Sequence, residues 1–332
     1  MSRRSGTVLR RLLFAVLILV AFFAGLEGLT RLLWDGPEVE GRMPADPRLR
    51  WGLTPGGEMV VEGVANRINS RGYRGPEIEV ERTPCILRIY SAGDSSAFGH
   101  GVPDGQAFAE LLPDRLGTRG VTDLRVEAIN GAVPGYSTYQ SLERMDQDGW
   151  ALQPDLLLIS NVWSDAGPAD VPDEEFYETQ PAPRQRFPGA PDPSPRRLRF
   201  VEWAAEWLTP PRPTHADPGH GGGYRRVSSH RYESNLRRMV DRAREHGAAP
   251  LFIVLPLSSD RDDQMAGPAA GDPRIRGDDP RSEDEDYREL MRRAAAEREV
   301  PVVDLVPVFI EGGGETLFID DVHPNVAGHA LI

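Results

Sequence analysis

The feature that most constrains the fold is an alternation of short apolar runs with helical patterns, which begins at residue 85. The apolar runs have strand length and composition, and they cover residues 85–91, 125–129, 156–160, 250–255 and 302–305. Helical patterns lie between or after them, at 105–116, 138–147, 230–246, 283–298 and from 326 onward. This alternation predicts an α/β fold with a parallel sheet covered on both faces, whose active groups lie at the carboxyl ends of the strands.

A turn of small residues that carries a serine follows the first of these strands. The stretch Ile86–Gly99 reads ILRIYSAGDSSAFG, and Asp94 and Ser95 come directly after its apolar part. A serine on a tight turn between a strand and a helix stands where open α/β sheets place their chemistry. An ordinary turn, in which an Asp or Ser caps the next helix, fits the same letters. The stretch alone leaves both interpretations open.

A histidine near the other end of the chain supplies the base that a nucleophilic serine needs. His323 stands in the segment DDVHP at 320–324, where its spacing from Asp320 lets one turn present carboxylate and imidazole together. Pro324 is expected to open a helix at its first position. The alternative is a helix-capping turn with a surface histidine.

Acyl transfer also needs hydrogen-bond donors for the oxyanion that develops on the carbonyl oxygen. Gly135 follows the second strand on a Pro-Gly turn, where a backbone N–H can be presented. A side-chain donor is expected from the loop after the third strand, residues 161–165.

Taken together, these residues resemble the conserved blocks of the SGNH or GDSL hydrolase family. The first block is similar to GDSS at 93–96 with Gly99, the second to the segment from Asn130 to Gly135, and the last to Asp320-x-x-His323. The resemblance spreads over residues 85–332. It implies a three-layer α/β/α sandwich around a five-stranded parallel sheet, the flavodoxin-like SGNH fold.

The resemblance also implies roles for individual residues. Ser95 would be the nucleophile and an oxyanion donor through its N–H, with Asp320 and His323 as its triad partners. Gly135 would be the oxyanion glycine. No metal or organic cofactor is required. Asp94 is expected to hold the turn.

The third block departs from the family pattern. The family carries Gly-x-Asn-Asp there, with the Asn side chain in the oxyanion hole, whereas this chain has VWSD at 162–165. Ser164 stands where the Asn is expected, and its hydroxyl can donate one hydrogen bond, although with a shorter reach. Asn161, three residues earlier, is the alternative donor.

The amino-terminal segment has the composition of a membrane anchor. Residues 1–11 are basic and are expected to stay in the cytoplasm, and residues 12–33 are expected to form a signal anchor that crosses the membrane as one helix. A cleaved signal peptide is the alternative. Either way, the rest of the chain is expected outside the cytoplasm, in the periplasm or at the cell surface.

The remaining boundaries follow from composition. Residues 34–84 are predicted to be a juxtamembrane linker with a β arm, in which 59–61 and 67–69 form short strands. The hydrolase-like domain is predicted over 85–332. A Pro-rich insertion at 166–225 interrupts it near the mouth of the site, with one helix at 197–208.

Charge and cysteine content narrow the function classes. The formal net charge of −13 argues against a nucleic-acid partner. The single Cys85 excludes an internal disulfide and a cysteine zinc site, and it is expected to be a buried filler.

These observations predict a membrane-anchored serine esterase that hydrolyses acyl esters, such as acetyl esters, of an extracytoplasmic glycan or lipid. Two alternatives remain open at this point. The first is an O-acyltransferase that acts on an envelope polysaccharide. The second is a non-catalytic binding module that retains the fold.

Overall fold

The structure is a computed structural model, and it describes residues 2–33, 43–46, 48–81, 85–118, 120, 124–169, 172–179, 224–260 and 286–332. The contacts divide the chain into two compact units. One contains the amino-terminal helix, and the other comprises Glu40–Pro183 and Thr214–Ile332.

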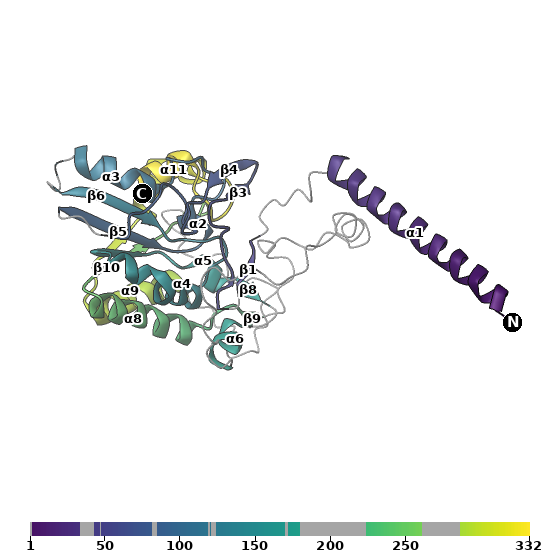
Figure 1. Cartoon of the computed structure of the whole chain (residues 1–332). Coiled ribbons are helices and arrows are strands. Elements are labelled where there is room, and N and C mark those ends of the chain that lie inside the picture. The colour runs from purple at the N-terminus through teal and green to yellow at the C-terminus, as the bar shows by residue number, and fades with distance from the viewer. Residues whose placement is uncertain are drawn as a thin grey trace. The chain divides into compact units, whose positions relative to one another are not determined.

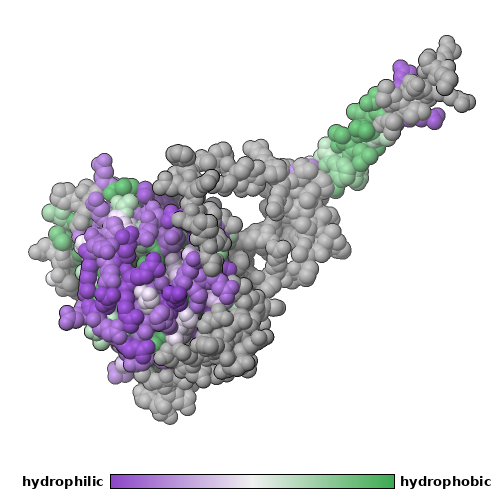
Figure 2. All heavy atoms as spheres, turned by 90° about the horizontal axis from the view of Figure 1, so that it is seen from below, coloured by the Kyte–Doolittle hydropathy of each residue, from purple (hydrophilic) through white to green (hydrophobic). Residues whose placement is uncertain are grey.

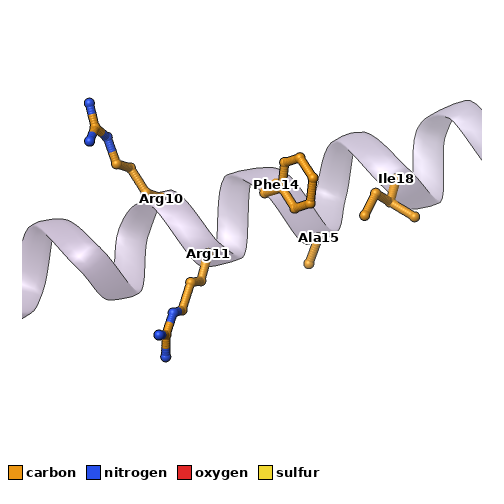
Figure 3. A pocket seen from close by; sticks show the side chains of 5 residues that line it. All are labelled: Arg10, Arg11, Phe14, Ala15 and Ile18. Atoms are coloured by element: carbon orange, nitrogen blue, oxygen red, sulfur yellow. The ribbon is translucent and has the colours of Figure 1, made fainter.

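The amino-terminal helix is α1 (Ser2–Leu33), drawn in purple in Figure 1. Its stretch Leu13–Thr30 has a mean hydropathy of 2.3 and is long and apolar enough to cross a membrane, by length and composition. Figure 2 shows this part of α1 as a continuous hydrophobic surface. Figure 3 shows the junction between its basic and apolar parts, with the side chains of Arg10, Arg11, Phe14, Ala15 and Ile18. The predicted apolar helix at the amino terminus is confirmed.

The second unit is built on a five-stranded sheet in which every neighbouring pair is parallel. Its strands are β5 (Ile86–Ala92), β6 (Arg125–Asn130), β7 (Leu156–Ile159), β10 (Ala249–Val254) and β11 (Val302–Asp304). Their spatial order is β11-β10-β7-β5-β6. The strand order reverses between β5 and β7, and open α/β sheets bind their ligands at such a reversal. The predicted parallel sheet is confirmed.

Helices cover both faces of the sheet and complete the three predicted layers (Figure 1). One face carries α3 (Phe108–Thr118) and α11 (Val326–Leu331). The other carries α4 (Thr138–Arg144), α8 (Ser229–Glu245) and α9 (Tyr287–Arg298). The face of this unit presented in Figure 2 is largely hydrophilic.

Some elements differ from the sequence-based expectation. The helix predicted over 138–147 ends as an α-helix at Arg144 and continues as a π turn, Met145–Gly149, and then a 3₁₀ turn, Trp150–Leu152. Cys85 is exposed, because it precedes β5 with a φ of 69° and lies outside the buried part of the strand. The prediction of a buried cysteine is wrong.

Short helices follow several strands. The sequence analysis did not predict them, because they are too short to show an apolar periodicity. They are α2 (Ser95–Phe98), α5 (Trp163–Ala166) and α10 (Val306–Gly312), with a 3₁₀ turn at Gly314–Leu317. The first two follow β5 and β7, so they lie at the carboxyl edge of the sheet.

Two antiparallel pairs make up the segment 43–81, which we call the arm. They are β1 (Ala45–Asp46) with β2 (Arg50–Trp51), and β3 (Glu58–Val61) with β4 (Val64–Arg67). The second strand of the hairpin begins earlier than predicted, because Glu62 and Gly63 have φ values of 50° and 72° and form a two-residue turn.

The arm packs as part of the α/β unit. The buried guanidinium of Arg74 donates to the carbonyl oxygens of Phe98 and Gly99, at 3.0 and 2.7 Å, directly after α2. Asn66 donates to the carbonyl oxygen of Val102 at 2.9 Å. Because the arm and the sheet belong to one compact unit, the arm is not a linker outside the domain, as the predicted boundary at residue 84 implied.

The base of the predicted insertion at 166–225 is closed by a short ladder. β8 (Pro168–Ala169) pairs antiparallel with β9 (Tyr224–Arg225). α6 (Asp173–Thr179) lies inside the insertion. The predicted helix at 197–208 lies outside the described residues.

Candidate active site

The turn after β5 presents Ser95 at the start of the short helix α2. Asp94 caps this helix by accepting a hydrogen bond from the Ser96 N–H at 3.0 Å. Gly93 is required because a Cβ at that position would lie 2.5 Å from the Cβ of Ala97. The half-buried side chain of Ser95 lies just beyond the carboxyl end of β5, at the point where the strand order reverses between β5 and β7.

The hydroxyl of Ser95 meets a histidine and an aspartate from the opposite end of the chain. Ser95 Oγ lies 2.7 Å from His323 Nε2, and His323 Nδ1 lies 2.6 Å from Asp320 Oδ2. The other oxygen of Asp320 accepts hydrogen bonds from the N–H groups of Val322 and His323, at 2.9 and 2.8 Å. One turn thus holds the carboxylate and the imidazole, in the order that nucleophilic hydrolysis by serine requires.

The partners of His323 determine where its proton lies. An ionised carboxylate only accepts hydrogen bonds, so Nδ1 of the neutral ring carries the hydrogen and Nε2 accepts from the Ser95 hydroxyl. Burial acts to raise the pKa of Asp320. The hydrogen bond from His323, the positive charge of the protonated His323 ring and the backbone N–H groups outweigh burial and hold that pKa well below its usual range. Asp320 therefore stays ionised at neutral pH.

The helix after this turn begins at Val326, where the sequence pattern predicted it. Asn325 caps α11 by accepting from the N–H groups of Ala327 and Gly328, so Pro324 lies before the helix. The prediction that Pro324 opens the helix is wrong. Pro324 instead pairs with Phe318 in an antiparallel bridge that closes the loop around Asp320.

The carboxylate of Asp94 joins the Ser95 turn to the loop after β7. One oxygen accepts from the Ser96 N–H, and the other accepts from the N–H groups of Trp163 and Ser164, both at 3.1 Å. Full burial raises the pKa of Asp94, while the backbone hydrogen bonds oppose that rise. Asp94 holds the turn, as predicted, and it also fixes the start of α5.

The two predicted side-chain donors differ in their surroundings. Asn161 is fully buried, and its Nδ2 donates to the carbonyl oxygen of Tyr136 at 3.3 Å and to Ser141 Oγ at 3.0 Å. Both of its N–H hydrogens are therefore used inside the core, which leaves none for an oxyanion. The Ser164 hydroxyl is half-buried and has no hydrogen-bond partner within the described ranges.

Within the described part of the chain, the predicted backbone donors have no hydrogen-bond acceptor. No described group accepts a hydrogen bond from the N–H of Ser95 or of Gly135. Gly135 adopts a left-handed conformation with a φ of 75°, which favours glycine.

A comparison of the sequence with protein families identifies the wider group. The model of the GDSL-like Lipase/Acylhydrolase family matches residues 91–331. The chain belongs to this family. The match begins within β5 and ends in α11, so it contains all the site residues described above, and it shows that this protein is a hydrolase that acts on esters. The arm at 43–81 lies outside the matched region.

Solved structures resemble this hydrolase at low sequence identity. Axe2, an acetylxylan esterase from Geobacillus stearothermophilus, is 17% identical, with a TM-score of 0.45 over 74% of this chain and 90% of its own. The lipase/acylhydrolase from Enterococcus faecalis is 16% identical, with a TM-score of 0.44 and the same coverage. The comparison with curated proteins gave no match.

A second serine next to Ser95 supports the histidine turn of this hydrolase. Ser96 Oγ donates to the carbonyl oxygen of Val322 at 2.8 Å, across 226 residues of sequence. This bond fixes the backbone one residue before His323. The sequence analysis gave Ser96 no role, and the pair of adjacent serines was the only signal that pointed to it.

The sequence analysis also missed His100. Its ring stacks on that of His323, with centroids 4.0 Å apart and an interplanar angle of 15°. Burial and the charge of His323 lower the pKa of His100 to about 4, against the opposing effects of Asp320 and Glu62. A neutral imidazole therefore covers one face of His323 at neutral pH.

A metal site would need several His, Cys, Asp or Glu side chains close together. Within the described residues, no group of three or more His, Cys, Asp or Glu side chains is placed to hold a metal ion. His323, the one imidazole bonded to both a carboxylate and a serine hydroxyl in these ranges, has both ring nitrogens engaged.

Proposed function

We propose that this hydrolase is a serine esterase in which Ser95 is the nucleophile, His323 the general base and Asp320 the group that orients the base. The observation that carries the proposal is the continuous hydrogen-bonded chain from Ser95 Oγ through His323 to Asp320. A serine hydroxyl is a weak nucleophile, and it needs such a base to lose its proton as it attacks.

The proposed reaction has two halves. Ser95 Oγ attacks the acyl carbonyl carbon while its proton passes to His323 Nε2, and the tetrahedral intermediate then expels the alcohol, which takes that proton. Water repeats the sequence on the acyl-enzyme, again with His323 as base, and releases the carboxylic acid. Asp320 stabilises the imidazolium that forms in each half.

The oxyanion is proposed to receive hydrogen bonds from the N–H groups of Ser95 and Gly135 and from the Ser164 hydroxyl. The absence of other partners for these three donors among the described residues supports this assignment. Donors that are free before the substrate binds need no rearrangement when the negative charge develops.

The substrate is proposed to be an acyl ester, such as an acetyl ester, of an extracytoplasmic glycan or lipid. The support is α1, which we propose to be a signal anchor with its basic start in the cytoplasm. Protease added to intact spheroplasts should then degrade the esterase domain. Complete protection of the domain would contradict this topology.

The test of the esterase proposal is turnover of a chromogenic acetate by the full chain. Ser95→Ala should lower kcat by roughly 10⁵- to 10⁶-fold, the scale seen when a triad serine is removed. Ser70→Ala is the matched control, because Ser70 is exposed and its hydroxyl bonds Glu77 in the arm. Unchanged turnover by the Ser95 variant would contradict the proposal.

Water is the proposed acceptor of the acyl group. Hydrolysis and transfer share the acyl-enzyme, so the two are separated by adding a sugar acceptor during turnover. The proposal expects the added sugar to leave the rate of acetate release unchanged. An acyltransferase would form the acetylated sugar at the expense of acetate.

A further inference from the structure

The peptide group between Pro134 and Gly135 is hydrogen-bonded by Trp51, a residue of the arm that lies outside the family-matched region 91–331. The carbonyl oxygen of Pro134 accepts a hydrogen bond from the indole Nε1–H of Trp51 at 3.1 Å. In a trans peptide the C=O and the N–H point in opposite directions. The hydrogen bond to Pro134 therefore fixes the direction in which the Gly135 N–H points.

Trp51 also packs directly on Gly135. A Cβ at Gly135 would lie 3.2 Å from Cζ2 of the indole, so the bare face of the glycine lies against the ring. Tyr136, the next residue, donates its hydroxyl hydrogen to the carbonyl oxygen of Trp51 at 2.8 Å. The side chain and the backbone of Trp51 thus contact three successive residues, from Pro134 to Tyr136, and the tryptophan is only 8% exposed.

A half-buried arginine, Arg226, holds the other side of the same glycine. Arg226 donates a hydrogen bond to the carbonyl oxygen of Gly135, and its Nε donates to Asp173 at 3.2 Å. The guanidinium lies over the Trp51 ring, 5.1 Å from the centroid. Asp173 is fully buried and also accepts from Ser137 Oγ at 2.6 Å. Both peptides of Gly135 are therefore anchored at their carbonyl oxygens.

We infer that Trp51 is a positioning residue of the esterase, which sets the direction of the oxyanion-binding N–H of Gly135 from the arm that precedes the family-matched domain. The inference rests on the proposed role of Gly135. The arm is then part of the active site, because the donor that Gly135 presents depends on a side chain that the matched region 91–331 does not contain.

The inference is tested with Trp51→Phe, which keeps an aromatic ring against Gly135 and removes the indole N–H. A peptide free to tilt binds the oxyanion less well in the transition state, while ground-state binding of the ester does not depend on it. We expect kcat of the full chain for a chromogenic acetate to fall roughly tenfold to hundredfold, with KM unchanged. Phosphonylation of Ser95 by a fluorophosphonate, which develops negative charge on its phosphoryl oxygen in the transition state as fluoride leaves, should slow by a similar factor.

Trp150→Phe is the matched control. Trp150 is 9% exposed and donates its indole N–H to Asp146 at 3.0 Å, in the turn after α4. The Trp150→Phe variant also loses one indole N–H hydrogen bond from a similarly buried ring, and this ring does not contact Gly135. We expect its kcat to equal that of the wild type.

Three variants measured together separate the possible failures. Equal kcat values for Trp51→Phe and Trp150→Phe, with Ser95→Ala inactive, would overturn the inference and leave the esterase proposal standing. Turnover by Ser95→Ala would overturn the proposed function itself. A Trp51→Phe variant with a raised KM and an unchanged kcat would show that Trp51 binds the ester rather than positioning the donor.

Discussion

The two sides of the active site are built in different ways. On the base side, Asp320 and His323 are three residues apart, and backbone N–H groups of the same turn bind the carboxylate. On the oxyanion side, the supporting contacts cross long stretches of chain: 83 residues separate Trp51 from Pro134, and 91 separate Gly135 from Arg226. The carboxylate and the imidazole of the base side form a local motif, which the bond from Ser96 to Val322 joins to the Ser95 turn, whereas the supports of the Gly135 donor come from separate distant parts of the chain.

This difference has a functional consequence. The base side depends on a few side chains in direct contact with one another, so the loss of one of them removes a chemical step. The oxyanion side presents backbone N–H groups whose direction depends on several distant supports, so the loss of one support shifts a donor without removing it. We therefore expect large effects from variants on the base side and graded effects on the oxyanion side.

The largest expected effect after loss of the nucleophile is that of Asp320→Asn. An amide in place of the carboxylate favours the wrong tautomer of His323, and kcat should fall by about 10⁴-fold. Asp321→Asn is the matched control, because Asp321 is the adjacent exposed carboxylate, and its kcat should not change. A loss of less than about tenfold in the Asp320 variant would contradict the proposed role of this carboxylate.

Asp94→Asn tests the link between the two sides. Both oxygens of Asp94 accept from backbone N–H groups, so an amide nitrogen at either place would face a donor. We expect the free energy of unfolding to fall by about 2 kcal/mol and kcat/KM by roughly a hundredfold. Urea denaturation and initial rates measure the two effects. A stable variant of full activity would show that the turn keeps its shape without this carboxylate.

Ser164→Ala and Asn161→Ala separate the two candidate side-chain donors on the oxyanion side. Removal of the Ser164 hydroxyl should lower kcat by about tenfold with little change in stability. Asn161→Ala leaves its buried partners unbonded, so it should lower the free energy of unfolding by about 1–3 kcal/mol and leave kcat of the folded enzyme unchanged. The reverse pattern would assign the donor to Asn161.

The smallest expected effect is on the pH dependence of stability, through His100 on the base side. The pKa of His100 is about 4 in the folded protein against an ordinary value of 6.5. The unfolded chain therefore binds the proton more readily, and stability falls as pH drops below 6.5 until it levels off near 4. His100→Phe should flatten this part of the stability profile, measured as Tm against pH. His230→Phe, which replaces an exposed histidine on α8, should leave the slope as in the wild type.

The same contrast explains how much could be predicted from the sequence. Local patterns predicted the parallel sheet, Ser95 and the Asp320–His323 pair. These patterns were apolar runs, a turn of small residues and a three-residue spacing, respectively. Ser96 gave only a faint local signal of its supporting role, namely its position directly after Ser95 in the first block.

The supports of the oxyanion side carry no such local pattern. Trp51 stands in a Gly- and Pro-rich stretch, and only the folded arm brings its indole to Pro134. Asn161 was a reasonable donor by position along the chain, and burial alone directs its amide into the core. The arm was predicted as a linker because the contacts that join it to the sheet, such as those of Arg74 with Phe98 and Gly99, lie outside its own sequence window.

The central claim is that Ser95 carries the acyl group during turnover. The most direct measurement is mass spectrometry of the full chain, quenched in acid during turnover of an activated acetate ester and then digested. The account predicts an acetyl group on the peptide that contains Ser95 and its absence from the same peptide of Ser95→Ala. An acetyl group on another residue, with turnover that persists in the Ser95 variant, would contradict it.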